Sequence, residues 1–285
     1  MPSKNRGVTL IELLIALVIS SILIAALYRT FIGQQKTYIV QDQVVDMQQN
    51  ARVAISKMMR DVRMAGFGGV DSGVKDVLNL PGGVNGPIKR ITTYPSSTDK
   101  IDNDNSITIV GGFKQIRRDT GDPITVDSAS GNTVTLDYTP NADEFNTPAK
   151  RFISIGGVES HKFEINGKVL TLDNTLRVNH LKGTPIFKVQ AITYDLGISG
   201  GKNVLRRDEN TGGGPQPLAE NIENLQFTYF DANGVETANP ADIRMVRLTV
   251  IARTSISDPD YKGGDGFRRR TIVSNIQVRN MGISP

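Results

Sequence analysis

The sequence of 285 residues contains no cysteine, no tryptophan and only two histidines. The absence of cysteine excludes disulfides and thiolate metal sites, so a folded domain has to be held together by its hydrophobic core. Hydrophobic residues make up 38% of the chain and charged residues 22%, which is typical of a globular protein rather than a disordered one. The net charge is only +4, and Lys4 and Arg6 supply part of it. Nucleic acid is therefore not an expected partner.

Proline is absent between Pro2 and Pro81, and residues 8–32 also lack glycine, so nothing in this region interrupts a helix. Residues 8–28 contain a single charged side chain, Glu12. As a helix they would extend about 31 Å, the thickness of a bilayer core. The sequence therefore predicts one membrane span at 8–28. Lys4 and Arg6 place the N-terminus in the cytoplasm by the positive-inside rule and the rest of the chain on the other side.

Two simpler interpretations of this segment are a cleaved secretory signal and a plain signal anchor. A secretory signal needs a small-residue cleavage site, and residues 20–31 offer only poor candidates. A plain anchor accounts for the length and the flanking charges. It does not account for Glu12, because a carboxylate disfavours membrane insertion.

The stretch KNRGVTLIELLIALVIS at residues 4–20 resembles the N-terminal signature of type IV pilins and of type II secretion pseudopilins. The resemblance implies that residues 1–7 are a leader and that a prepilin peptidase cleaves after Gly7. It further implies N-methylation of Val8 and places Glu12 at the fifth mature position, where the family keeps an acid. The family most often has phenylalanine where Val8 stands.

Cleavage would give Glu12 a partner, because it turns the amide nitrogen of Val8 into an ammonium group. A buried pair of opposite charges is far less costly than either charge alone. Residues Val8 and Glu12 are four apart and share one helix face. The carboxylate can neutralise its own amine or the amine of a neighbouring subunit, and the second arrangement would make assembly depend on processing.

The helical pattern continues beyond the membrane segment and predicts one helix over residues 8–65. An apolar stripe at spacings of three and four suits packing against a globular domain. Its members are Val40, Val44, Met47, Ala51, Ile55, Met58, Val62 and Ala65. Gly66 and the following glycines predict the helix end. Major pilins often have a proline where Arg29 stands, and its absence argues against a bulk filament subunit.

From residue 66 the hydrophobic period changes to two, which predicts a largely antiparallel β domain over 66–285. The whole chain is therefore predicted to be α+β and pilin-like. The expected strands are residues 106–113, 132–138, 150–156, 161–167, 168–173, 184–196, 224–231, 243–254 and 268–280. Residues 206–217 are expected to form a loop.

The C-terminal half narrows the resemblance. Residues 51–69, 217–234, 243–255 and 268–282 resemble, in this order, segments of the minor pilin W family, which is related to pseudopilin J of type II secretion. Residues 70–215 carry no such resemblance. The implied protein is a non-catalytic minor pilin that helps to initiate a type IV pilus and sits at or near its tip. A type II secretion pseudopilin is the alternative, followed by a DNA-uptake pilin and a membrane-tethered periplasmic enzyme.

The implied partners are the prepilin peptidase, the inner membrane, and other minor pilins and the major pilin, contacted through the N-terminal helix. A tip adhesin is a further candidate. The implied location is the inner membrane, with a single span and a periplasmic domain, and then the assembled pilus.

The remaining motifs give little support for catalysis, metal binding or nucleic-acid binding. GISGG at 197–201 has the spacing of a nucleophile elbow around Ser199, but both histidines precede it, so we interpret it as a glycine turn. His161 and His180 are expected at the surface or at strand edges, and no cofactor is expected. Asp258, Asp260 and Asp265 are candidate calcium ligands without the EF-hand register. The basic runs 116–118 and 268–270 lack interleaved aromatic residues.

Overall fold

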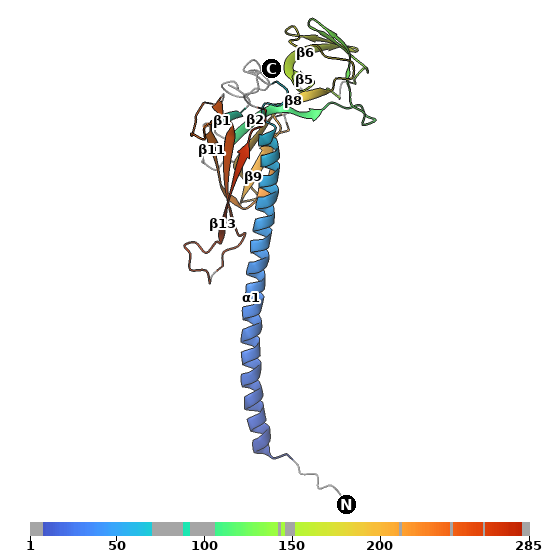
Figure 1. Cartoon of the computed structure of the whole chain (residues 1–285). Coiled ribbons are helices and arrows are strands. Elements are labelled where there is room, and N and C mark those ends of the chain that lie inside the picture. Colours follow the sequence, from blue (N-terminus) through green and yellow to red (C-terminus); the bar gives the residue numbers. More distant parts are fainter. Residues whose placement is uncertain are drawn as a thin grey trace, which may run out of the picture. The chain divides into compact units, whose positions relative to one another are not determined.

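The computed structural model describes residues 8–69, 88–91, 106–141, 144–145, 152–210, 213–239, 242–258 and 260–280. The chain begins with one long helix, α1 (Leu10–Arg63), which lies within the range expected from the sequence (Figure 1). Two compact units divide the chain. One comprises residues 1–47 with 254–268, and the other residues 48–253 with 269–285.

The strands form two sheets, and every described pairing is antiparallel. The larger sheet has the order β1-β2-β8-β5-β6-β7-β4-β3, with β9 beside β8 and β10 beside β9. Its strands are β1 (Ile88–Ile91), β2 (Ser106–Gln115), β3 (Val126–Ser130), β4 (Thr133–Leu136), β5 (Phe152–Ile155), β6 (Glu159–Asn166), β7 (Val169–Leu172), β8 (Ile186–Ser199), β9 (Lys202–Asp208) and β10 (Gln216–Glu220). The smaller sheet has the order β11-β12-β13, with strands β11 (Ile222–Phe230), β12 (Met245–Arg253) and β13 (Arg269–Gln277).

The predicted fold class is confirmed, because one long N-terminal helix packs with a mostly antiparallel sheet domain. All nine expected strands are present. The expected loop at 206–217 is wrong in part, because β9 continues to Asp208 and β10 begins at Gln216. The charged pair Arg206 and Arg207 looked like loop sequence, but each guanidinium has a carboxylate partner elsewhere in the fold.

The end of α1 packs on the sheet domain through the predicted apolar stripe. Ala51, Ile55, Met58 and Val62 are all buried, together with Ala54. Two of these five residues are alanines, which lets the helix approach the sheet closely. The stripe therefore anchors the last four turns of the helix in the hydrophobic core.

One carboxylate within this contact is also buried. The Asp61 side chain accepts a hydrogen bond of 2.6 Å from the Tyr194 hydroxyl and one of 3.1 Å from Arg207 Nε. Tyr194 is completely buried in β8. Burial raises the pKa of Tyr194, and the Asp61 carboxylate raises it further, so the phenol stays protonated and donates. The charge of Asp61 thus ties α1 to both β8 and β9.

Glycines make the turn after the helix possible. Gly66 has φ of 76° and donates its N–H to the Val110 carbonyl of β2 at 3.0 Å. Gly69 also has positive φ, and a Cβ atom there would lie 2.0 Å from the Val158 carbonyl oxygen. Phe67 sits between these glycines and packs edge-to-face on Phe187 of β8 at 5.1 Å. The glycines that were predicted to end the helix therefore also allow the chain to pack against β2 and the β5–β6 turn.

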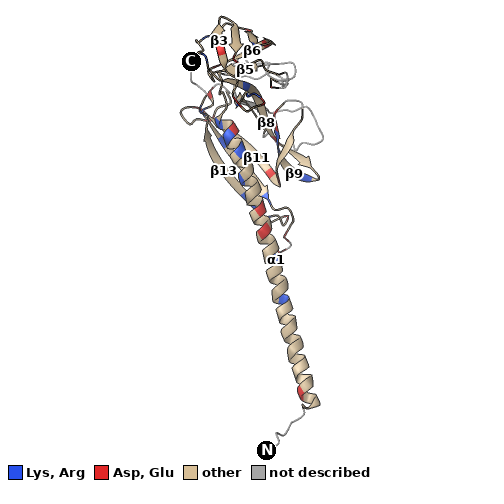
Figure 2. Cartoon of the chain, turned by 90° about the vertical axis from the view of Figure 1, so that its right-hand side faces the viewer, with Lys and Arg blue, Asp and Glu red and all other residues tan. Residues whose placement is uncertain are grey.

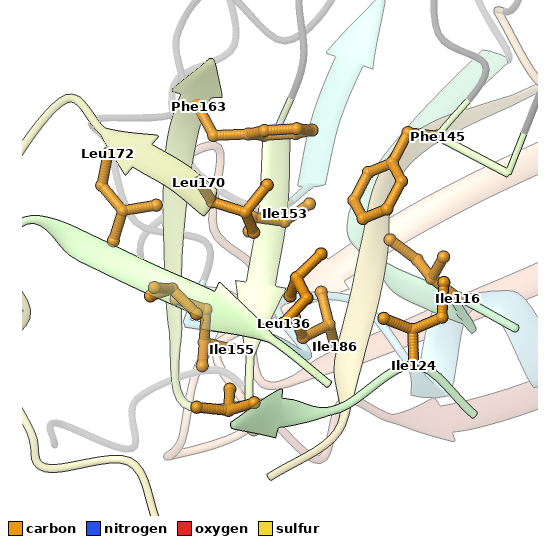
Figure 3. Close-up of a cluster of buried hydrophobic side chains, with 12 residues drawn as sticks. Ile116, Ile124, Leu136, Phe145, Ile153, Ile155, Phe163, Leu170, Leu172 and Ile186 are labelled. Atoms are coloured by element: carbon orange, nitrogen blue, oxygen red, sulfur yellow. The ribbon is translucent and has the colours of Figure 1, made fainter. Parts of the chain in front are cut away.

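The segment between β2 and the start of β8 has a hydrophobic core of its own (Figure 3). Residues from β3 to β7 and the flanking loops contribute aliphatic side chains, and Phe145 and Phe163 meet edge-on at 5.5 Å between ring centres. The core consists of Ile116, Ile124, Val126, Val134, Leu136, Phe145, Ile153, Ile155, Phe163, Leu170, Leu172 and Ile186. Strand β8 joins this core to the rest of the sheet, because residues 186–188 pair with β5 and residues 193–199 with β9.

The expected surface position of the two histidines is wrong. Both rings are buried and point at the buried Glu159 of β6. His161 Nε2 and His180 Nε2 lie 2.9 and 2.6 Å from the two carboxylate oxygens and must act as donors. The N–H groups of Arg177 and Val178 donate to the same carboxylate at 2.9 and 3.4 Å. This cluster holds the loop between β7 and β8 in place.

Asp61→Ala should destabilise the sheet domain by about 3 kcal/mol, because it leaves the Tyr194 hydroxyl and one face of Arg207 buried without the carboxylate. Urea unfolding of fragment 30–285, followed by circular dichroism, measures the loss. Lys57→Ala is the matched control on the same helix, since its ammonium is 4.0 Å from Asp61 and partly exposed. Equal stability losses for the two variants would contradict the role given to Asp61.

Glu159→Gln should destabilise the same fragment by about 2–3 kcal/mol, since an amide cannot accept from four donors. Burial opposes ionisation of Glu159, but the hydrogen bonds from Arg177, His161 and His180 outweigh it and lower its pKa. The stabilisation is therefore complete above the usual carboxyl value of 4.5 and disappears as the pH falls through the lower folded-state pKa. Unfolding curves at a series of acidic pH values test this.

Glu164→Gln is the control for this prediction, because Glu164 lies on the same strand with its side chain exposed. It should change the free energy of unfolding little and leave the acid dependence intact. A Glu159→Gln variant with unaltered stability at neutral pH would show that the cluster does not stabilise the loop.

Candidate processing and assembly site

The segment with the prepilin-like pattern is described from Val8 onward, and Gly7 lies outside the described residues. Val8 is 74% exposed, and the helix begins two residues later. The first part of α1 is long and apolar enough to cross a membrane, and none of its most apolar window is buried within the protein. Figure 2 shows this part of the helix almost free of charged residues. The apolar side chains are therefore available to lipid or to other helices.

Thr9 and Glu12 form a capping box at the start of α1. The backbone N–H and the hydroxyl of Thr9 both donate to Glu12 Oε2 at 2.8 Å. In return, the Glu12 N–H points at the Thr9 hydroxyl oxygen at 3.4 Å. Such reciprocal bonds satisfy backbone N–H groups that a helix start otherwise leaves unpaired. Water cannot satisfy them inside a membrane, so the cap is of particular value here.

This capping role of Glu12 was not predicted, although the sequence contains its signal. The pattern Thr-x-x-Glu directly before an apolar run is the signature of a capping box. Thr9 was considered only as part of the family signature, and Glu12 only as the partner of an ammonium at Val8. The structure gives the acid a second task that does not require cleavage.

Glu12 also lies close to the nitrogen of Val8, which the predicted cleavage would turn into an amine. Its Oε2 already accepts from the backbone nitrogen of Thr9. The nitrogen of Val8, the preceding residue, is about 4 Å from that of Thr9. Within the described residues, Oε1 has no partner. A carboxylate in this position can accept from an ammonium at Val8 without giving up the cap.

The candidate calcium ligands lie in the loop between β12 and β13, and each has a contact within the protein. Asp258 accepts two hydrogen bonds from Arg268, at 3.1 and 2.8 Å, and these hold the pKa of Asp258 below its usual range. Asp260 lies 3.7 Å from Lys36, and Asp265 accepts from the N–H of Phe267. The described residues contain no group of three or more side chains arranged to hold a metal ion. The calcium site stays a prediction.

The basic runs are largely neutralised by neighbouring acids. In 268–270, Arg268 is bound by Asp258 and Arg269 forms two hydrogen bonds with Glu223. In 116–118, Arg118 is paired with Asp137 at 2.7 Å. These three guanidinium groups are therefore paired with carboxylates within the fold, whereas Arg117 donates to the Gly121 carbonyl and to Gln115.

Ser199 is the last residue of β8 and is followed by a tight turn. Gly200 and Gly201 both have positive φ, of 56° and 76°, as a two-residue hairpin of this kind requires. Both histidine rings are bound to Glu159. The interpretation of GISGG as a glycine turn is confirmed.

One comparison with known proteins agrees with the N-terminal pattern. Residues 2–28 match the family described as the prokaryotic N-terminal methylation motif. A search of curated protein sequences gives no match. Among solved structures, the type IV-like pilin TTHA1219 from Thermus thermophilus is similar, with 13% identity, 33% of this chain and 68% of that chain covered, and a TM-score of 0.22. The chain thus carries a prepilin-type methylation motif at the start of a membrane-length helix.

Proposed function

We propose that this protein is a minor pilin that helps to initiate a type IV pilus and stays at or near the tip of the filament. The observation that carries the proposal is the N-terminal segment: Lys4 and Arg6, then Gly7, then an apolar helix with an acid at its fifth position. The match to the methylation motif supports it.

In this proposal, prepilin peptidase cleaves after Gly7 and the new N-terminus at Val8 is methylated. The subunit waits in the inner membrane with its N-terminus cytoplasmic and its β domain periplasmic. It then assembles with other minor pilins and the major pilin through the apolar half of α1, and a tip adhesin is a candidate neighbour. Because α1 is exposed along this half, a filament can bury it without any refolding of the protein.

The assembly step uses the charge of Glu12. The carboxylate pairs with the ammonium of Val8 in its own chain or in a neighbouring subunit, in surroundings where an isolated charge is costly. Only a cleaved subunit offers that ammonium. The pairing would therefore restrict assembly to processed chains.

The mature chain should begin at N-methylated Val8. Mass spectrometry of the protein purified from its native membrane measures the N-terminal peptide directly. Replacement of Gly7 by a residue bulkier than alanine should leave an inserted but uncleaved precursor. A mature start at Met1, or beyond Ala26, would overturn the proposed processing.

Deletion of the gene should remove or strongly reduce surface pili and leave type II protein secretion intact. The opposite result would identify the protein as a secretion pseudopilin. Complementation then tests the site. Glu12→Leu should insert normally but enter sheared filaments about tenfold less than the native chain, since the ammonium of Val8 loses its partner.

Two further variants separate the cap from the charge. Glu12→Gln keeps an oxygen that can accept from Thr9 but removes the charge, so incorporation should fall, to a level between those of Glu12→Leu and the native chain. Thr9→Val removes the capping hydroxyl, keeps the charge and should assemble nearly normally. If Thr9→Val is the more damaging of the two, helix capping rather than charge pairing explains the acid.

A further inference from the structure

The long loop between β12 and β13, residues 254–268, belongs to the same compact unit as the first part of α1. Its acid Asp260 lies 3.7 Å from Lys36 of the helix. This loop is therefore next to the helix just after the helix leaves its apolar segment. No role for the loop follows from pilus assembly.

Several contacts join residues within the loop. The Arg268 guanidinium binds Asp258 twice and also lies over the Tyr261 ring, 5.0 Å from its centre. The Asp258 N–H donates to the Gly266 carbonyl at 2.8 Å, and the Tyr261 N–H to the Asp258 carbonyl at 3.0 Å. These contacts give the loop a fixed surface.

That surface combines apolar and cationic groups. Ile256 is 62% exposed, Tyr261 is 38% exposed, and Lys262 is exposed beside it. The acids Asp258 and Asp260 are directed at Arg268 and Lys36. Ile256, Tyr261 and Lys262 thus present an aliphatic chain, a phenol and an ammonium group, the combination that favours the boundary between lipid and water. The carboxylates of Asp260 and Asp265 are exposed on the same loop.

The position of the loop along α1 matches that boundary. The apolar run ends between Tyr28 and Ile32, with the long side chain of Arg29 able to reach the headgroups. Lys36 follows Ile32 by four residues, about 6 Å along the helix. The headgroup layer on each side of a bilayer is of similar thickness, about 5–8 Å.

We propose that the loop of residues 254–268 rests on the headgroup layer of the membrane that α1 spans. Tyr261 and Ile256 enter the interface, and Lys262 faces the lipid phosphates. The bilayer is favoured over a protein partner because the loop and the apolar helix belong to one unit, so a bilayer around the helix meets the loop. The inference rests on the membrane anchor of the proposed function and goes beyond it.

The absence of tryptophan allows a direct test on the full chain. Tyr261→Trp introduces the only tryptophan, at an exposed aromatic position. The protein is reconstituted in vesicles of phosphatidylcholine and phosphatidylglycerol, with or without bromine atoms on the acyl chains close to the glycerol. The brominated lipid should quench the emission about twofold, as for a side chain at the interface.

Two single-tryptophan variants provide the controls. Tyr28→Trp reports the anchor and should be quenched. Leu181→Trp, at a site 78% exposed in the loop between β7 and β8, should not be quenched. Quenching of Tyr28→Trp without quenching of Tyr261→Trp overturns the inference alone. If Tyr28→Trp is not quenched either, the membrane anchor fails and the inference fails with it.

A second change tests the chemistry of the contact. Lys262→Glu in the Tyr261→Trp background should weaken the quenching in vesicles with phosphatidylglycerol, because it replaces attraction to anionic headgroups by repulsion. A blue-shifted emission that brominated lipid does not quench would mean that protein rather than lipid covers the loop, and would overturn the proposal.

Discussion

The hydrogen bonds of the Asp61 carboxylate are the constraint on which the arrangement of the sheet domain depends. An acid in the last turns of a helix, on its buried face, is acceptable only if donors surround it. Tyr194 and Arg207 provide them from two neighbouring strands. Both donors are held by the backbone pairing of β8 and β9. The carboxylate therefore fixes the rotation of the helix end about its axis and its position along that axis, which the apolar stripe alone does not do. Methionine and alanine side chains tolerate sliding, whereas two donors on neighbouring strands that bind one carboxylate oxygen do not.

Strand β8 connects the helix contact at Asp61 to the remainder of the domain. Tyr194 lies in the part of β8 that pairs with β2 and β9, and the beginning of the same strand pairs with β5. Ile186, at that beginning, belongs to the second hydrophobic core. One strand thus carries both the partner of the helix and a wall of the separate core. The chain leaves β2 to form the separate core and returns in β8, which pairs again with β2.

The alternation of apolar and polar residues was sufficient to predict the longer strands and the fold class. β12 shows why: its buried and half-buried positions alternate along its length, as the sequence does. β9 was missed because its residues Arg206 and Arg207 resemble loop residues until their partners, Asp195 and Asp61, are known. Such pairs join residues distant in sequence, and no local pattern records them.

The two histidines also show that contacts between residues distant in sequence are hard to predict. His161 alternates with polar residues in β6, and His180 lies in a loop without regular structure, so both looked like surface residues. Their burial depends on Glu159, which is two residues from one and twenty-one from the other. The capping box differs, because Thr9 and Glu12 are three residues apart and the pattern was readable. Local chemistry can be predicted from the sequence, whereas chemistry that the fold assembles cannot.

The same distinction explains how Glu12 can serve two states of one chain. Before cleavage, its carboxylate already accepts two hydrogen bonds from Thr9, although its charge has no cationic partner. After the proposed cleavage, the ammonium of Val8 would lie one residue before Thr9, and Glu12 Oε1 would be available to it. The partner arrives where the acid is held in advance, so little side-chain freedom is lost on pairing. A free acid on a mobile side chain would have to be ordered first. Thr9 therefore holds the Glu12 carboxylate in place and closes the start of the helix.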